Sequence, residues 1–267
     1  MLSFAAICPH PPIIIPSIGA GEAKKVKSTV SAMEQLARNL EKQNPETIII
    51  VSPHGKIEME KMIIETSPKL YGDFLSFGDS TKMNFENDSE LAEEIFNESE
   101  NTEIPARKIQ DGWLDHGTMV PLYFLAENLE KTKIVPLAYS FLDYESHFEF
   151  GKAIYQAIAK HPAKVAFVAS GDLSHRLTPD APAGYSSSGA QFDKLLVGLL
   201  KKGDTQSILK LDPQLIEEAG ECGFRSICVL LGVLEARSTE SGKSWQAEIL
   251  SYEWPFGVGY LVANFKF

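Results

Sequence analysis

Four of the six histidines occupy positions where the side chains of an α/β protein commonly meet to do chemistry. His10, His54 and His175 each follow a short apolar run, and His116 lies in a glycine-flanked loop ahead of a helical pattern. Imidazole binds metals through a neutral ring nitrogen and transfers protons near neutral pH. Because loops at the carboxyl ends of strands converge in space, we expect these four side chains to form one polar cluster.

A carboxylate that would complete such a cluster lies in the segment EEAGECGFRS. Glu217 and Glu218 suit the start of a helix, where negative charge is favourable, whereas Glu221 is flanked by small residues. Two neutral imidazoles and one carboxylate on one side of Fe(II) leave open positions for a substrate and O2. A zinc hydrolase uses the same kind of ligand set, and Cys222 is a softer candidate ligand that favours zinc or copper.

Four further polar residues have less definite roles. Asp115 and Asp172 either orient the histidines that follow them or are ordinary turn residues. His147 and His161 lie within or at the end of a predicted helix, and we interpret them as surface or capping residues.

The elements that would position these residues alternate between strands and helices. Apolar runs predict strands at 2–8, 47–51, 134–139, 165–169, 247–252 and 257–265. Helical spacing predicts helices at 21–43, 87–99, 144–160, 190–201 and 205–211, and after Gly223. Two short runs, 62–65 and 75–77, suggest strands of a small antiparallel unit. The sequence therefore predicts a single three-layer α/β domain over residues 1–267, with a central mixed, mainly parallel sheet flanked by helices.

The composition argues against several classes of partner. The chain has 25 basic and 36 acidic residues, a formal charge of −11 at pH 7, and no basic patch. We therefore expect it to bind neither nucleic acid nor an anionic membrane. The three cysteines are odd in number and lack CxxC spacing, which argues against disulfides and favours a cytoplasmic location. No apolar run approaches the roughly 20 residues of a membrane span.

Five motifs, taken in order, resemble those of the class III extradiol ring-cleavage dioxygenases. They are PHPP at His10, SPHG at His54, DHGTMVPL at His116, SGDLSHR at His175 and GECGFRSI at Glu221. The closing EWPFGVGY resembles the last motif of that family as well. The resemblance spans nearly the whole chain and is to the catalytic LigB-type subunit superfamily, which includes the Memo proteins. Dioxygenase-like proteins associated with the AmmeMemoRadiSam group are the most similar.

This resemblance implies a LigB-like fold and a role for each motif residue. His10, His54 and Glu221 would bind Fe(II), and His116 would contact the substrate or the bound oxygen. His175 would be the second-sphere acid/base that takes a proton from a catechol. The implied reaction is cleavage of a small catechol-like or aminophenol-like aromatic substrate with O2. A homo-oligomer and a small partner subunit both remain open.

Memo-type relatives carry a cysteine in the region of the carboxylate ligand, which leaves Cys222 as an alternative to Glu221. Three hypotheses follow. The resemblance favours an Fe(II)-dependent extradiol dioxygenase. The first alternative is a zinc hydrolase that uses a metal-bound water with His175 as its base. The second is a Memo-like protein that binds a metal or a ligand without ring cleavage.

Overall fold

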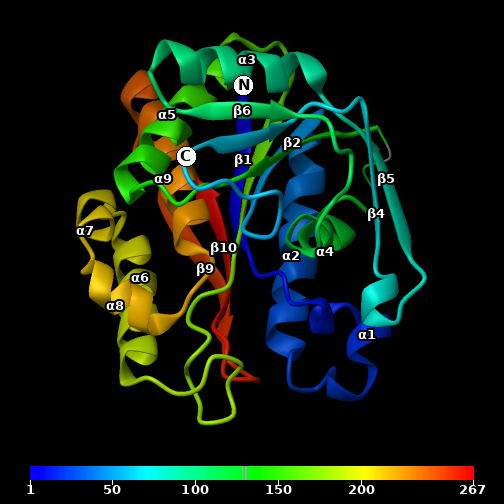
Figure 1. The fold of residues 1–267 in the computed structure, drawn as a ribbon, viewed down its shortest axis with the longest axis vertical. Helices are drawn as coiled ribbons and strands as arrows, with labels where there is room; N and C mark the ends of the chain where they lie inside the picture. The colour runs from blue at the N-terminus through cyan, green and yellow to red at the C-terminus, as the bar shows by residue number, and fades with distance from the viewer. Residues whose placement is uncertain (128, 130) are drawn as a thin grey trace.

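An eight-stranded sheet runs through the computed structural model, which describes residues 1–127, 129 and 131–267 (Figure 1). Its strand order is β6-β3-β7-β2-β8-β1-β10-β9. The strands of this sheet are β1 (Leu2–Cys8), β2 (Thr47–Ser52), β3 (Met62–Glu65), β6 (Ala106–Ile109), β7 (Lys133–Ala138), β8 (Val165–Ser170), β9 (Gln246–Glu253) and β10 (Tyr260–Lys266). The central strands β7, β2, β8 and β1 pair in parallel, and antiparallel strands join them on both sides. The prediction of a mixed, mainly parallel sheet is confirmed.

Helices cover both faces of this sheet, which confirms the predicted three layers (Figure 1). The helices are α1 (Pro16–Gly19), α2 (Lys27–Gln43), α3 (Ser89–Asn101), α4 (His116–Leu125), α5 (Tyr144–Lys160), α6 (Ser187–Lys202), α7 (Thr205–Leu209), α8 (Pro213–Ala219) and α9 (Phe224–Ser241), with short 3-10 turns η1 (Pro12–Ile14), η2 (Ala20–Glu22) and η3 (Leu75–Phe77). None of the helices in the described residues is long and apolar enough to cross a membrane.

Strand β2 shows why the sequence of the central strands is apolar throughout. Ile48 and Ile50 belong to the core under α2 and α4, whereas Ile49 and Val51 belong to the core under α3, α5 and α9. A strand that is buried on both faces needs no alternation of polar and apolar residues. Such a strand ends where its first polar residues appear, and these residues then lie at the edge of the sheet.

The small antiparallel unit exists, but its strands are not those that the sequence predicted. Met62–Glu65 forms β3 of the main sheet, and Leu75–Phe77 is the 3-10 turn η3. The unit consists of β4 (Lys69–Asp73) and β5 (Lys82–Glu86), which flank that turn. In β5, intermediate and exposed side chains alternate, as expected for a strand with one face open to water.

The interpretation of His147 as a surface or capping residue was wrong, because its side chain is 0% exposed. Its Nδ1 lies 2.7 Å from the carbonyl oxygen of Asp143, and its Nε2 lies 3.1 Å from that of Ser140. The ring thus closes the loop between β7 and α5. His161 is the C-cap of α5, as predicted.

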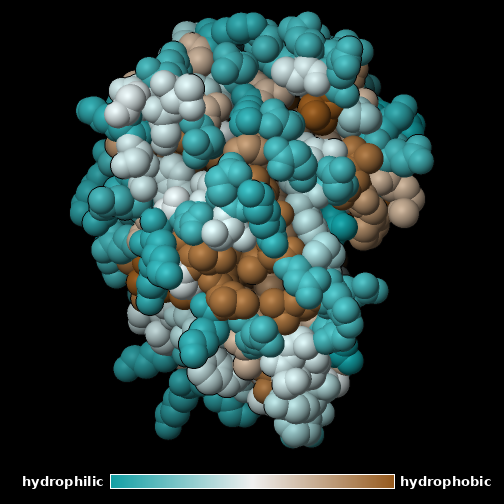
Figure 2. Space-filling model, turned by 90° about the vertical axis from the view of Figure 1, so that its left-hand side faces the viewer, coloured by the Kyte–Doolittle hydropathy of each residue, from teal (hydrophilic) through white to brown (hydrophobic). Residues whose placement is uncertain are grey.

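The face that carries α5, α6, α7, α8 and α9 combines apolar and hydrophilic surface (Figure 2). Figure 2 shows that apolar side chains gather in the middle of this face and that hydrophilic side chains surround them. The hydrophilic rim is in keeping with a chain of formal charge −11.

Candidate metal centre

Three of the four histidines meet at the carboxyl ends of the central strands. His10 follows β1 and His54 follows β2, on either side of β8, and His116 is the first residue of α4. The ring centres of His10 and His54 are 4.7 Å apart, and those of His10 and His116 are 5.6 Å apart. The rings of His54 and His116 are stacked, with 4.2 Å between their centres.

A hydrogen-bond chain fixes the tautomer of His10. The Ser170 hydroxyl at the end of β8 donates its only proton to the carbonyl oxygen of Gly117 at 2.5 Å. Ser170 Oγ must therefore accept from His10 Nδ1, which lies 3.1 Å away and carries the ring proton. His10 Nε2 is then unprotonated, and it lies within hydrogen-bonding distance of His54 Nε2, at 3.0 Å. A metal-binding histidine is usually held by such a bond from its other ring nitrogen.

Of the two neighbours Glu221 and Cys222, it is Cys222 whose donor atom lies beside this histidine pair. Cys222 Sγ lies 3.7 Å from His10 Nε2, and the ligand atoms of His10, His54 and Cys222 lie within 4.8 Å of one another. Glu221, the expected carboxylate ligand, instead turns to the start of α9. Its Oε2 accepts the backbone N–H of Phe224 at 2.5 Å, which satisfies a free amide of the first helical turn.

Two glycines bring the cysteine into this position. Gly171 follows β8 and Gly223 precedes α9, and a Cβ built on Gly171 would lie only 2.1 Å from the Gly223 Cα. Between them, the Asp172 carbonyl oxygen accepts the N–H of Gly223 at 2.9 Å. The N–H of Asp172 in turn donates to Cys222 Sγ at 3.4 Å. The close approach of these two backbones therefore requires residues without a Cβ.

His175 borders the same cysteine. Its ligand atom and those of Asp172 and Cys222 lie within 4.8 Å of one another. Its backbone N–H donates to the carbonyl oxygen of Ala219 at 3.3 Å. The buried Nδ1 of His175 has no hydrogen-bond partner among the described residues. A buried ring nitrogen in this state is available to a bound molecule.

The carboxylates of Asp115 and Asp172 each accept a backbone N–H group at the site. Asp115 is the N-cap of α4, where it accepts the N–H of Thr118 at 3.1 Å and the hydroxyl of Ser52 at 2.6 Å. Asp172 Oδ1 accepts the N–H of His10 at 3.2 Å, and Asp172 Oδ2 lies 3.7 Å from His10 Nε2. Asp115 is therefore a capping residue, and Asp172 positions His10.

Burial favours the neutral form of all four imidazoles. Burial lowers the pKa of His10 well below 6.5, and the nearby histidines lower it further. Desolvation and the adjacent His116 lower the pKa of His54 to about 4, although this residue remains partly exposed. Desolvation also lowers the pKa of His116 and of His175. Burial raises the pKa of the Cys222 thiol, so this thiol must lose its proton when a metal binds.

The spacing of the two imidazole nitrogens fits a single metal ion, and the spacing between nitrogen and sulfur is slightly longer than such an ion requires. Two nitrogens that each lie about 2.1 Å from an ion are about 3.0–3.4 Å apart for bond angles from 90° to tetrahedral, and a nitrogen and a sulfur are about 3.1–3.6 Å apart. The nitrogens of His10 and His54 are 3.0 Å apart, and His10 Nε2 is 3.7 Å from Cys222 Sγ. Two imidazoles and a thiolate form a set that suits zinc or copper.

Residues 4–263 match the model of the family described as the catalytic LigB subunit of aromatic ring-opening dioxygenase. The chain belongs to this family. The resemblance seen in the motifs is therefore confirmed at the level of the LigB family.

Two curated relatives and one solved structure resemble this LigB-family chain. Protein CA_C1420 of Clostridium acetobutylicum is 38% identical over 270 residues, which cover 97% of this chain and 56% of that protein. The 3,4-dihydroxyphenylacetate 2,3-dioxygenase of Escherichia coli is 28% identical over 173 residues, 61% of this chain and 62% of that enzyme. The chain thus spans little more than half the length of either relative.

The solved structure is that of the uncharacterized protein JW3007 from Escherichia coli K12. It is 16% identical and superimposes with a TM-score of 0.66 over 98% of this chain and 99% of that chain. At this low identity the similarity supports the α/β fold alone.

Three residues of the LigB-type site escaped the sequence analysis. Ser170 fixes the His10 ring, Tyr139 donates its hydroxyl to the carbonyl oxygen of Cys222 at 3.2 Å, and the Phe77 ring centre lies 5.5 Å from that of His116. Ser170 and Tyr139 each lie at the end of an apolar run, and this position could have marked them as residues at the edge of the sheet where the histidines meet. Phe77 lies in the turn between β4 and β5, and no sequence pattern links it to the histidines.

Proposed function

We propose that the chain is a metal-dependent extradiol-type dioxygenase that opens a catechol-like or aminophenol-like ring with O2, and that its metal is Fe(II). The main support is the unprotonated Nε2 of His10, which Ser170 orients through Nδ1 and which lies 3.0 Å from His54 Nε2. Family membership and the similarity to an Escherichia coli ring-cleaving dioxygenase support the same activity.

His10 and His54 would hold the metal, with Cys222 or Glu221 as the third donor. A bound ion of this kind orients the ring substrate and O2 and supplies the redox chemistry. His175 would accept the proton of a substrate hydroxyl, because burial favours its neutral form and its Nδ1 has no partner among the described residues. His116 would contact the substrate or the oxygen, since its ring stacks on that of His54.

The position of Cys222 favours a second candidate function. A thiolate beside two imidazoles is a better ligand for zinc than for iron, and a zinc-bound water would make the site a hydrolase with His175 as its base. For Glu221 to serve as the ligand instead, its carboxylate would have to leave the Phe224 N–H that it now accepts.

Metal analysis after anaerobic purification separates these candidates. We expect iron to bind in about equal amount to protein, and Fe(II)-reconstituted protein to convert a member of a catechol and aminophenol panel into a yellow ring-opened product. Tightly bound zinc with no ring cleavage after Fe(II) reconstitution would refute the dioxygenase proposal. If no compound of the panel reacted, whichever metal was loaded, the result would favour the Memo-like binding protein.

A further inference from the structure

The guanidinium group of Arg225 lies among aromatic rings next to the candidate metal centre. Its central carbon lies 5.1 Å from the ring centre of Tyr144 and 5.3 Å from that of Phe141. The same carbon lies 5.9 Å from the ring centre of Tyr139, whose hydroxyl donates to the carbonyl oxygen of Cys222 at 3.2 Å. One tyrosine ring therefore connects Arg225 to the cysteine that lies beside the histidine pair.

The charge of Arg225 has no direct partner among the residues that the structure describes. Its buried Nε makes no hydrogen bond, and no described carboxylate lies within ion-pair distance of the guanidinium. Burial raises the pKa of Glu221 to about 7 and the charge of Arg225 partly offsets this rise, but the Glu221 carboxylate accepts the N–H of Phe224 instead. Aromatic faces attract a guanidinium without accepting all of its N–H groups. The rings thus hold Arg225 in place and leave its donors available to a bound group.

Helix stability does not account for a cation at this position. Arg225 is the second residue of α9, and the N-terminus of a helix carries a partial positive charge. A positive side chain is unfavourable there, whereas an anion is stabilised. The guanidinium can be reached from solvent, since Phe141 is 51% exposed and Arg225 itself is partly exposed. The side chain and the helix end together favour an anionic ligand.

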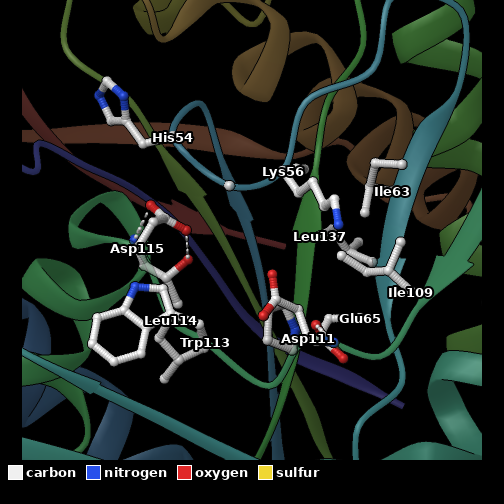
Figure 3. A pocket seen from close by; sticks show the side chains of 14 residues that line it. His54, Lys56, Ile63, Glu65, Ile109, Asp111, Trp113, Leu114, Asp115 and Leu137 are labelled. Atoms are coloured by element: carbon white, nitrogen blue, oxygen red, sulfur yellow. Dashed lines mark hydrogen bonds between the residues drawn. The ribbon is translucent and has the colours of Figure 1, made fainter.

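The cleft of about 250 Å³ beside His54 is a poorer place for an anion (Figure 3). The ring of His54 points away from this cleft. Among the described residues, its charged lining consists of one lysine and three carboxylates, which are Lys56, Glu65, Asp111 and Asp115. This excess of negative charge repels an anion. Arg225 is therefore the better candidate for recognising an anionic group near the metal centre.

We propose that Arg225 determines substrate specificity by pairing with a carboxylate on a side chain of the aromatic substrate. The ring of the substrate binds at the metal centre, and its side chain extends past Tyr139 toward the start of α9. A planar guanidinium binds a carboxylate through two parallel N–H···O bonds, which an ammonium group cannot do. This inference rests on the proposed ring cleavage and narrows its substrates to catechols or aminophenols with an acidic side chain.

Calorimetric binding to the zinc-loaded full chain tests this inference without turnover. Two probes, 3,4-dihydroxybenzoate and 3-(3,4-dihydroxyphenyl)propanoate, carry a carboxylate on side chains of different length, whereas 4-ethylcatechol is neutral and dopamine is positively charged. The better of the two acids should bind at least about 10-fold more tightly than 4-ethylcatechol, and dopamine should bind more weakly than 4-ethylcatechol. Acids that bind no better than 4-ethylcatechol would overturn this inference and leave ring cleavage unaffected. Binding of none of the four compounds would refute the proposed function and this inference with it.

Two substitutions of Arg225 make the test specific. Arg225→Met keeps a long apolar side chain against the rings, so it should bind 4-ethylcatechol like the native chain and lose the preference for the acid. Arg225→Lys retains the charge and should keep part of that preference. An equal loss of affinity for all four compounds in Arg225→Met would indicate a structural role and contradict the proposal.

Arg237→Met is the matched control for these variants. Arg237 lies near the other end of α9, and its guanidinium carbon lies 4.3 Å from the ring centre of Phe267. The control thus removes a cation from the same helix and from a similar ring contact. It should bind all four compounds like the native chain, and a loss of the acid preference in this variant would contradict the assignment to Arg225.

Discussion

Replacing Ser170 by alanine should weaken metal binding although Ser170 is not itself a ligand. The substitution removes the acceptor of the His10 Nδ1 proton, so the ring is free to carry its proton on Nε2 instead. Loss of such a partner typically lowers metal affinity about 10- to 100-fold, or about 1.4–2.7 kcal/mol. The Gly117 carbonyl also loses its donor, which should reduce the free energy of unfolding by about 1–3 kcal/mol.

Competition for Zn²⁺ with a chromophoric chelator measures this affinity at a temperature where the variant is folded. Ser99→Ala is the matched control, because Ser99 is also 0% exposed and its hydroxyl donates to the Phe96 carbonyl oxygen at 2.7 Å on α3. The control should lose stability but keep native metal affinity. Native affinity in Ser170→Ala, or an equal loss in the two variants, would refute the tautomer argument.

Three further predictions concern the same region. His175→Ala should retain metal and lose turnover about 10²- to 10⁴-fold; loss of metal in elemental analysis would contradict its role. Cys222→Ala should lower Zn²⁺ affinity more than Glu221→Ala does, and the reverse order would restore the carboxylate as the ligand. Burial raises the pKa of Asp193 from 3.8 to about 6. The folded state therefore favours the protonated carboxyl, and this contribution to the free energy of unfolding is full below about pH 4 and is lost as the pH rises through 6. Between pH 4 and pH 8 the free energy of unfolding should fall by about 3 kcal/mol less in Asp193→Asn than in the native chain, as measured by urea unfolding.

The strands that carry the site could be predicted because they are buried on both faces. Leu2–Cys8 and Thr47–Ser52 are almost continuous runs of buried residues, and the polar residues that follow them mark the sheet edge. The β4–β5 hairpin could not be predicted, because its strands contain glycine and charged residues that disfavour strands. The more apolar segment Leu75–Phe77 was mistaken for a strand and is instead the turn between them.

The convergence of the histidines followed from general rules, whereas the tautomer of His10 did not. Any polar residues that follow parallel strands meet at one edge of the sheet, so His10 and His54 could be expected to approach each other. The Ser170 hydroxyl interacts with His10 only because Gly117 lies close enough to take its proton. That distance results from the packing of α4 against the sheet, and no local pattern in the sequence encodes it.

The identity of the third donor depends on tertiary contact in the same way. Glu221 and Cys222 are neighbours, and their composition alone suits either as a ligand. The contact between Gly171 and Gly223 draws the start of α9 against the end of β8, where Cys222 receives the Asp172 N–H and Glu221 caps Phe224. A thiolate favours zinc or copper, whereas a carboxylate completes the set expected for iron. The backbone contact that positions the cysteine therefore also bears on which metal the site selects.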